Sequence, residues 1–288
     1  MYNRHLLKLT FTFCIFLHVS FLSFSQEGSL LWKISGNGLS KESYLFGTIH
    51  IICKEDFVIN DRVKKAFESS EKLVMELDMS DPQLMTNIQQ HSLNPGMKNI
   101  QGELSEEDAS VMDAFFMKNF GVGLAQIGIL KPFVLSSMAL IKTLPCPETE
   151  SFEGYFTAQA QSQSKPIEGL ETVEIQMGTF DQIPAKVQLD ELVKMIKDES
   201  GAEEFKAMVT AYLEEDIEAL YQTMNQDGMT KEYRGIMLDS RNKAWIPQLQ
   251  EKMVKESVFV AVGSGHLAGE NGVISLLKHA GYQVEPVK

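Results

Sequence analysis

Basic residues are scarce in this sequence of 288 residues, which has 26 Lys and Arg against 39 Asp and Glu. The resulting formal net charge of −13 at pH 7 repels nucleic-acid phosphates and anionic lipids. We therefore exclude nucleic acid and anionic membrane surfaces as main partners. Beyond its N-terminus the sequence also has no apolar run long enough to predict a transmembrane helix.

Several familiar motifs are missing as well. The sequence contains neither His-Glu-x-x-His nor Gly-x-Ser-x-Gly, so it has no signature of a zincin protease or of an α/β-hydrolase nucleophile. Residues Gly263 to Ala268 match a loose Gly-x-Gly-x-x-Gly/Ala fingerprint, but almost nothing follows Glu285 to complete a nucleotide-binding half. We therefore expect no dinucleotide cofactor.

The first 25 residues have the composition of a secretory signal peptide. Arg4 and Lys8 form a positive start, Leu9–Phe24 is strongly apolar, and Ser23–Ser25 is a small-x-small cleavage site. Removing this segment takes away two basic residues and leaves 24 − 39 = −15. We expect a signal peptide at 1–25 and one domain at 26–288.

An uncleaved membrane anchor is the alternative for this N-terminal segment. Its apolar run is short for a span of about 20 residues, and no basic stop-transfer cluster follows it. Cys14 is followed by Ile15, which does not resemble the start of a mature lipoprotein. We therefore expect a secreted or periplasmic protein without stable membrane insertion after cleavage.

Cysteine is also rare, because only Cys53 and Cys146 remain after the expected signal peptide. Exactly two cysteines in a secreted chain predict one disulfide, which in the entropic model would restrict the unfolded chain by roughly 4–5 kcal/mol. Such a bridge would fasten the loop that carries His50, three residues before Cys53. The alternative is a pair of buried free thiols.

Strand-like segments occur at both ends of the chain and helix-like segments in the middle. Expected strands are Leu30–Ile34, Ser43–Ile49, Lys72–Leu77, Lys165–Gly169, Ser257–Val262 and Tyr282–Val287. The longest expected amphipathic helices are Pro184–Ser200, Glu203–Gln226 and Lys231–Lys255. We predict an α/β (α+β) fold, with a central mixed β-sheet formed from N- and C-terminal strands and a large helical section at about 80–256.

Two of the strand-like runs end with the same signature, Gly-x-x-His. The first is Gly47–His50 and the second is Gly263–His266. In α/β folds the carboxyl ends of strands form the ligand-binding edge of the sheet, and His is a common metal ligand and acid–base group. We therefore predict that His50 and His266 lie close together at one site.

Glu76 is the carboxylate that we expect beside these imidazoles. It follows Val74 and Met75 in an apolar strand, where a charged group is costly unless it is paired or bound to a cation. Two imidazoles and a carboxylate form a typical hydrolytic metal site with open positions for water. The alternative is that Glu76 pairs with a Lys or Arg near the edge of the sheet.

Three further residues stand in less decisive positions. Glu153 opens a predicted helix, where an acid complements the helix dipole without any further function. Arg241 and Asn242 lie inside a predicted helix, and Asn is unfavourable there unless its side chain has a partner. From spacing alone, a helix-dipole role for Glu153 and a solvated face for Arg241 are the simpler interpretations.

Taken together and in order, these segments resemble the TraB/GumN family, whose animal relatives are the Tiki metalloproteases. The resemblance is carried by Leu31–Gly36, Tyr44–His50, Val74–Asp78, Ser151–Glu153, Gly169–Gln176, Asp239–Asn242 and Val262–Gly269. It implies His50, His266 and Glu76 as metal ligands, with Glu76, Glu153, Arg241 and Asn242 as catalytic residues. In the second motif, the small residue that usually stands between Gly263 and Gly265 is Ser264, a minor departure from the family pattern.

We therefore expect a secreted metal-dependent hydrolase with a divalent ion (Mn, Co or Zn), acting on a peptide or protein substrate. Glu76 or Glu153 would serve as general base or ligand, and Arg241 or Asn242 would stabilise the oxyanion. The rival interpretation is a non-catalytic secreted protein that binds a peptide, glycan or pheromone in the same crevice.

Overall fold

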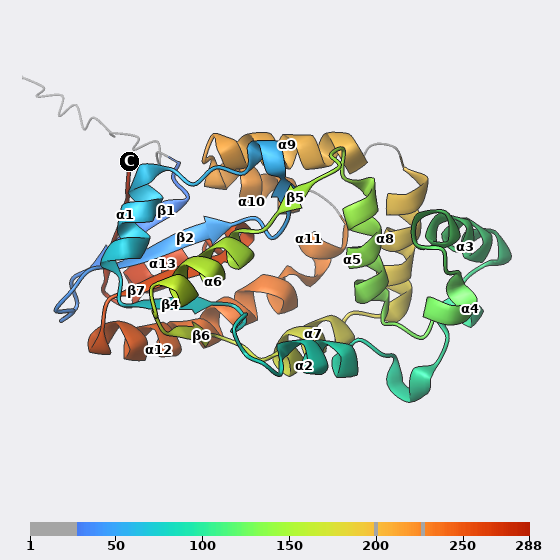
Figure 1. Ribbon diagram of the computed structural model, residues 1–288, viewed down its shortest axis with the longest axis horizontal. Coiled ribbons are helices and arrows are strands. Elements are labelled where there is room, and N and C mark those ends of the chain that lie inside the picture. Colours follow the sequence, from blue (N-terminus) through green and yellow to red (C-terminus); the bar gives the residue numbers. More distant parts are fainter. Residues whose placement is uncertain (1–27, 199–200, 226–227) are drawn as a thin grey trace, which may run out of the picture.

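The computed structural model describes residues 28–198, 201–225 and 228–288. A β-sheet occupies one end of the molecule, and a group of helices occupies the other (Figure 1). The six-stranded sheet has the order β6-β4-β7-β2-β1-β8, in which β1 runs antiparallel to both neighbours and the remaining pairs are parallel. Its strands are β1 (Leu31–Ser35), β2 (Ser43–Thr48), β4 (Lys72–Met75), β6 (Ile167–Gly169), β7 (Val258–Gly263) and β8 (Gln283–Pro286). The predicted mixed α/β fold is confirmed.

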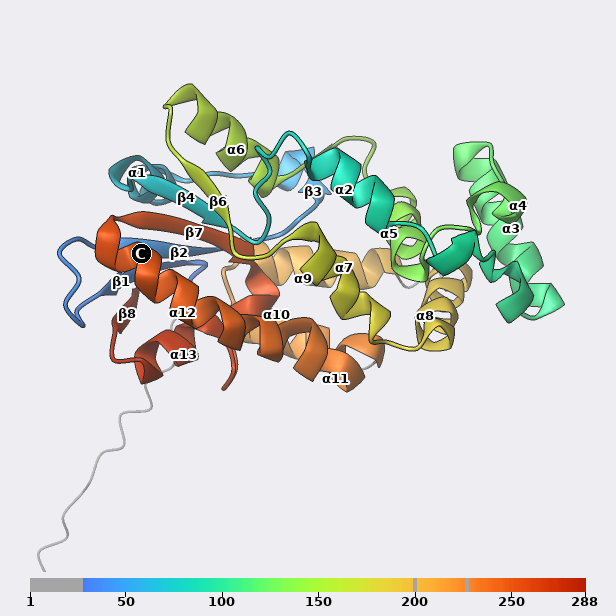
Figure 2. The same ribbon diagram turned by 90° about the horizontal axis from the view of Figure 1, so that it is seen from below.

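The helices cover the sheet and extend beyond it. Figure 2 shows α1 (Asp61–Ser69) and α6 (Phe152–Ser162) on one face of the sheet, and α12 (Ser240–Lys255) and α13 (Val273–His279) on the other. The helical end contains α2 (Leu84–His91), α3 (Glu106–Phe120), α4 (Leu124–Ile127), α5 (Pro132–Thr143), α7 (Val173–Asp181) and α8 (Ala185–Lys197). Between the two ends lie α9 (Gly201–Leu213), α10 (Ile217–Asn225) and α11 (Gly228–Arg234).

Strand β7 is the centre of the hydrophobic core. All six of its residues are buried, because parallel strands flank it on both sides and helices cover both faces. On the α6 side, Phe259 of β7 packs against Phe46, Phe67 and Phe156. This rigid strand holds the second Gly-x-x-His motif at its carboxyl end.

One sequence prediction about β4 is wrong. The strand was expected to run to Leu77, with Glu76 inside it, but β4 ends at Met75. The neighbouring strand β7 continues to Gly263, and the Gly263 N–H donates to the Glu76 side chain at 2.8 Å. The carboxylate thus takes the place of the next backbone partner, so Glu76 lies just past the strand.

Two predicted long helices are interrupted. The expected helix at 203–226 is divided into α9 and α10, and its last residue lies outside the described residues. The break occurs at Glu215, whose φ of 57° is left-handed and whose carboxylate accepts a hydrogen bond from the Leu30 N–H at 3.2 Å. A contact with Leu30, the residue before β1, therefore overrides the local helical pattern.

The expected helix Lys231–Lys255 is also not continuous. Between α11 and α12 lies a π-helical segment, Gly235–Asp239, in which the Ser240 N–H donates to the Gly235 carbonyl. π-Helical segments are rare in proteins, and those that occur are often found at functional sites. This one ends at Asp239 and leads into the first turn of α12, which carries Arg241.

A second, two-stranded sheet lies beside the main one and was not predicted. It pairs β3 (Ile52–Cys53) with β5 (Thr149–Glu150) in antiparallel register. The Cys53–Cys146 disulfide next to this pairing, with an S–S distance of 2.09 Å, confirms the predicted bridge. The bridge therefore joins the segment after His50 to the segment before Glu153.

Within the described parts of the chain, none of the helices combines the length and apolarity needed to cross a membrane. The expected signal peptide at 1–25 lies outside the described residues and stays a prediction. A disulfide is typical of proteins from oxidising compartments, in agreement with the expected secreted location.

Removing the disulfide should lower the free energy of unfolding by about 3–5 kcal/mol, because the bridge spans 93 residues of the unfolded chain. Urea unfolding of a Cys53→Ser/Cys146→Ser double variant measures the loss. A reductant should destabilise the wild-type protein to the same degree and leave the double variant unchanged. Equal stability of reduced and oxidised wild type would contradict the prediction.

Candidate functional site

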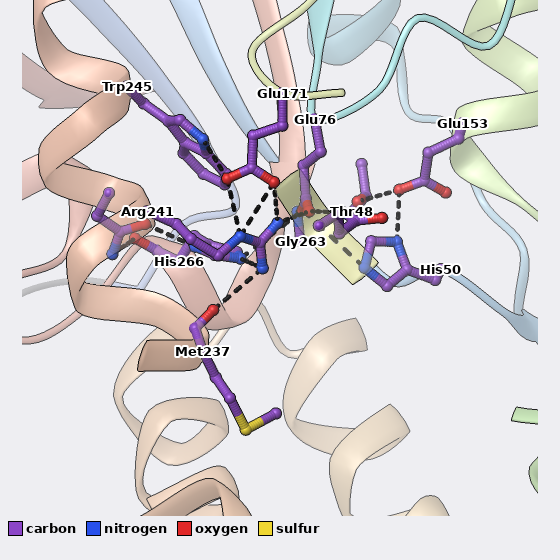
Figure 3. Close-up of polar contacts among 12 residues, drawn as sticks. Thr48, His50, Glu76, Glu153, Glu171, Met237, Arg241, Trp245, Gly263 and His266 are labelled. Atoms are coloured by element: carbon purple, nitrogen blue, oxygen red, sulfur yellow. Dashed lines mark hydrogen bonds and ion pairs between the residues drawn. The ribbon is translucent and has the colours of Figure 1, made fainter. Parts of the chain in front are cut away.

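The predicted site residues meet at the carboxyl edge of the main sheet (Figure 3). His50 follows β2, Glu76 follows β4, and His266 lies in a short 3₁₀ turn directly after β7. Because these three strands are neighbours in the sheet, their ends bring together residues that are far apart in the sequence. Helices α6 and α12 supply the remaining side chains from either side.

Glu153 holds His50 in place. Its Oε1 atom accepts hydrogen bonds from the Thr48 hydroxyl at 2.6 Å and from His50 Nδ1 at 2.9 Å. Ser151 caps the N-terminus of α6 and donates to Glu153 Oε2 at 3.0 Å. Glu153 lies in the first turn of α6, where its charge complements the helix dipole, and it also orients the imidazole of His50.

This carboxylate also sets the charge of His50. Partial desolvation lowers the pKa of the imidazole, but the hydrogen bond to Glu153 and the charges of Glu76 and Glu153 outweigh it and raise the pKa to about 9. The side chain is nevertheless 65% exposed, so water reaches the ring. With Nδ1–H donated to Glu153, the Nε2 atom faces Glu76 Oε1 at 4.0 Å.

His266 has a different environment. It is buried, and its ring stacks at a tilt on Trp245 with 4.4 Å between centroids. Asn242 fixes the tautomer: its Nδ2 donates to the Asn271 carbonyl at 2.8 Å, so its Oδ1 accepts from His266 Nδ1 at 2.6 Å. The lone pair is therefore on Nε2, which lies 3.8 Å from Glu76 Oε1. Burial, with the nearby charge of Arg241, lowers the pKa of His266 to about 3 against the attraction of Glu76.

Glu76 is the point on which both imidazoles converge. Its Oε1 accepts the Gly263 N–H at 2.8 Å, and its Oε2 accepts from Arg241 Nη2 at 2.7 Å and from Gln176 Nε2 at 3.1 Å. Burial alone would raise the pKa of this carboxyl, but the two histidines, Arg241 and the Gly263 N–H lower it to about 2. Pairing with an Arg, the alternative considered for Glu76, thus occurs inside the site itself.

Arg241 joins Glu76 to a second buried carboxylate, Glu171. Its Nε atom donates to Glu171 Oε1 at 2.9 Å, and its Nη2 donates to Glu171 Oε2 at 2.9 Å as well as to Glu76. The Nη1 atom donates to the Met237 carbonyl of the π-helical segment at 3.0 Å. This carbonyl helps to fix the guanidinium, which explains how the irregular turn before α12 contributes to the site.

Sequence reasoning did not assign Glu171, Gln176 or Trp245 to the site. Trp245 Nε1 donates to Glu171 Oε1 at 2.9 Å, so its indole supports the Arg241 network from α12. Glu171 and Gln176 stand within the stretch Gly169–Gln176 that carries the family resemblance. That stretch was the signal that could have identified them.

The donor chemistry of the site fits a divalent cation. The Nε2 atoms of two imidazoles face one carboxylate oxygen; that of His266 carries a lone pair, and that of His50 gains one when the imidazolium loses its proton. An amide and a carboxylate hold the opposite ring nitrogens in the manner of metal-bound histidines. The Nε2–Oε1 separations of 4.0 and 3.8 Å exceed the roughly 3–3.5 Å that a tetrahedral ion imposes on its ligands. In keeping with this, among residues 28–198, 201–225 and 228–288 no group of three or more His, Cys, Asp and Glu is arranged as a metal centre.

A cavity of about 270 Å³ opens beside His50. Its wall is formed by β5 and the start of α6, with Thr149, Glu150, Ser151 and Tyr155 among the lining residues. The volume is close to the lower end of the range for small-ligand pockets, about 300 Å³. A side chain of a bound molecule could therefore lie next to the exposed imidazole.

Comparison with known proteins places the chain in a family. The model of the TraB/PrgY/gumN family matches residues 30–286. The chain belongs to the TraB/PrgY/gumN family. The resemblance to the TraB/GumN family, inferred from the ordered set of segments between Leu31 and Gly269, is thereby confirmed.

Two relatives differ in how much of the chain they cover. An "Uncharacterized protein" of Treponema pallidum (strain Nichols) is 20% identical over 278 residues, which cover 88% of this chain and 81% of the relative. "Metalloprotease TIKI2" of Danio rerio is 32% identical over 81 residues, which cover 28% of this chain and 16% of TIKI2. Similarity to TIKI2 is thus confined to a small part of that protein. No solved structure matches the chain significantly.

Replacing Arg241 with Ala should lower the free energy of unfolding of the metal-free protein by about 3–5 kcal/mol. The variant leaves Glu76 and Glu171 buried side by side without their shared cation. Urea unfolding of EDTA-treated protein measures the change. Lys243→Ala, on an exposed position of the same helix, is the control and should change stability by less than about 0.5 kcal/mol. A similarly small effect of both variants would argue against a buried ion pair.

Glu153→Gln should lower the pKa of His50 in EDTA-treated protein from about 9 towards the ordinary value of about 6.5. The substitution removes the negative charge that favours the imidazolium, so the proton is lost at a lower pH. A two-dimensional NMR titration of the ring protons gives both values. Glu150→Gln, which removes an acid at the wall of the cavity, should have a much smaller effect. A wild-type pKa near 6.5 would contradict the prediction.

Proposed function

We propose that this member of the TraB/PrgY/gumN family is a metal-dependent hydrolase and that it cleaves peptide bonds. The single observation that carries the proposal is the convergence of His50 Nε2 and His266 Nε2 on Glu76 Oε1. Family membership and the short stretch of similarity to a protein named a metalloprotease support the choice of reaction. The net charge of −13 would repel a nucleic acid, which agrees with a peptide as the substrate.

His50, His266 and Glu76 would hold a divalent ion such as Mn, Co or Zn. Such an ion supplies Lewis acidity, which polarises a carbonyl and lowers the pKa of bound water. Glu153 keeps the Nδ1–H of His50 occupied and directs Nε2 into the site, while Asn242 does the same for His266. The Glu153 carboxylate and the Asn242 amide thus each fix the tautomer of one histidine. We assign Asn242 this orienting role because its Nδ2 and Oδ1 atoms are already hydrogen-bonded to Asn271 and His266.

Arg241 holds the carboxylates of Glu76 and Glu171 together. Its Nε and Nη2 atoms donate to Glu171 and Glu76, and one Nη1 contact goes to the Met237 carbonyl. A further Nη1 contact, 3.4 Å from His266 Nε2, brings the guanidinium close to the second imidazole. An oxyanion would be stabilised from there. Glu76 and Glu153, which lie 4.0 and 2.9 Å from the His50 ring nitrogens, are the candidate acceptors for the proton of an attacking water.

The cavity beside His50 provides a place for the substrate. It lies along β5, an exposed two-residue strand, and continues to the first turn of α6, where Glu153 is fixed. A side chain of the substrate in this cavity would bring the neighbouring peptide bond towards His50. Binding energy from such a remote group positions the reacting bond.

His50→Ala and His266→Ala should each abolish metal retention and hydrolysis while the circular dichroism spectrum stays unchanged, because neither side chain fills a large apolar core position. Glu76→Gln keeps the size of the side chain and should reduce turnover about 10²–10⁴-fold. Metal content is measured by inductively coupled plasma mass spectrometry and turnover with a peptide library. His279→Ala, at the exposed end of α13, is the control and should behave as wild type.

Two outcomes would overturn the proposal. Full activity and metal content in a folded His50→Ala or His266→Ala protein would remove these residues from the reaction. A wild-type protein that binds peptides or glycans stoichiometrically, without bound metal and without turnover, would instead establish the rival function of a ligand-binding protein.

A further inference from the structure

Two buried carboxylates lie side by side at the edge of the main sheet. Glu76 follows β4 and Glu171 follows the neighbouring strand β6, and the Glu171 N–H donates to the Glu76 carbonyl at 2.9 Å. Their side chains are 9% and 4% exposed. Like charges so placed repel in a poorly solvated environment, so their joint burial requires a compensating cation.

Arg241 is that cation, but it does not serve the two acids equally. Three hydrogen bonds at 2.9, 3.1 and 2.9 Å join its Nε and Nη2 atoms to Glu171. A single one at 2.7 Å reaches Glu76, and it goes to Oε2 alone. The Oε1 atom of Glu76 is left with the Gly263 N–H and faces both imidazoles.

The charges of this group do not cancel. Two carboxylates and one guanidinium leave one net negative charge in the buried cluster. If Glu171 were absent, Arg241 would neutralise Glu76 completely, and the side of the site opposite His50 and His266 would carry no net charge. Glu171 therefore changes the net charge beside His50 and His266 through its contacts with Arg241.

We propose that Glu171 is a positioning residue which keeps the Arg241 guanidinium occupied, so that Glu76 retains its negative charge towards His50 and His266. This inference rests on the proposed function, because the surplus charge favours a divalent cation between Glu76 and the imidazoles. Trp245 contributes by donating its Nε1–H to Glu171 Oε1 and by lying under the guanidinium, 5.2 Å from ring centroid to Cζ. These contacts hold the guanidinium on the Glu171 side of the cluster.

Titration of EDTA-stripped protein with Co²⁺ tests the proposal. Glu171→Gln retains an oxygen acceptor for Trp245 and Arg241 but removes the negative charge. It should raise the dissociation constant for Co²⁺ roughly 10–100-fold. The visible absorption spectrum of the saturated variant should match that of wild type, because the ligands themselves are unchanged. Isothermal titration calorimetry gives the affinity, and circular dichroism checks the fold.

Two further variants separate charge from structure. Glu171→Asp keeps the charge on a shorter side chain and should restore the affinity to within about threefold of wild type. Glu174→Gln removes an exposed acid three residues further along, in the first turn of α7, and should leave the affinity equally close to wild type. A loss in Glu171→Gln that is recovered in Glu171→Asp would establish the charge-based role.

Other results would overturn it. Wild-type affinity in Glu171→Gln, equal losses in Glu171→Gln and Glu171→Asp, or loss of folded structure in Glu171→Gln would each leave Glu171 without a charge-based role. In these cases Co²⁺ binding by wild type still stands, and so does the proposed function. Failure of the wild-type protein itself to bind Co²⁺ would overturn the metal-dependent function and this inference together.

Discussion

The Arg241 guanidinium between Glu76 and Glu171 is the interaction on which the rest of the site depends. Burying three charged groups is expensive, and the cost is offset only when each group has partners of good geometry. Here every contact comes from a different part of the chain: the ends of β4 and β6, the π-helical segment and the first turns of α12. The ion-pair cluster therefore fixes α12 against the sheet edge, and with it Asn242 and the ring of His266.

The two Gly-x-x-His motifs lead to opposite protonation behaviour from the same local sequence. His50 is exposed and bound to a carboxylate, so its pKa is raised to about 9, whereas buried His266 is bound to an amide and its pKa is lowered to about 3. At neutral pH the metal-free protein thus has an imidazolium at one position and a neutral ring at the other. A cation entering the site would have to displace the proton of His50, while the lone pair of His266 is already available.

Sequence reasoning could predict the features that depend on local pattern. The apolar runs around Gly47 and Gly263 gave the central strands, and two isolated cysteines gave the disulfide. Ser105 and Ser151 are the N-caps of α3 and α6, a position that serine favours. Because β2 and β7 are neighbouring parallel strands, the two imidazoles that follow them lie close together, as the repeated motif predicted.

The features that it missed depend on tertiary contacts. The end of β4 at Met75 is set by a side chain that replaces a backbone partner, and the break at Glu215 is set by a contact with Leu30. In the sequence, Glu171 is an ordinary acid before a helix, because its partners Arg241 and Trp245 follow some 70 residues later. Residue spacing does not predict these contacts, and only the family resemblance included the stretch that contains Glu171.

The positions of the acids follow from how the chain leaves the sheet. After β4 the chain departs into the helical end and returns through β5 and α6, and after β6 it departs again into α7 (Figure 1). Glu76 and Glu171 stand at these two departures and Glu153 at the return, so each acid is fixed on one side by a strand end or a helix start. The Cys53–Cys146 disulfide joins the end of the first helical stretch to the segment that follows His50. The strand ends, the return point and the cluster around Arg241 therefore fix the geometry of the site.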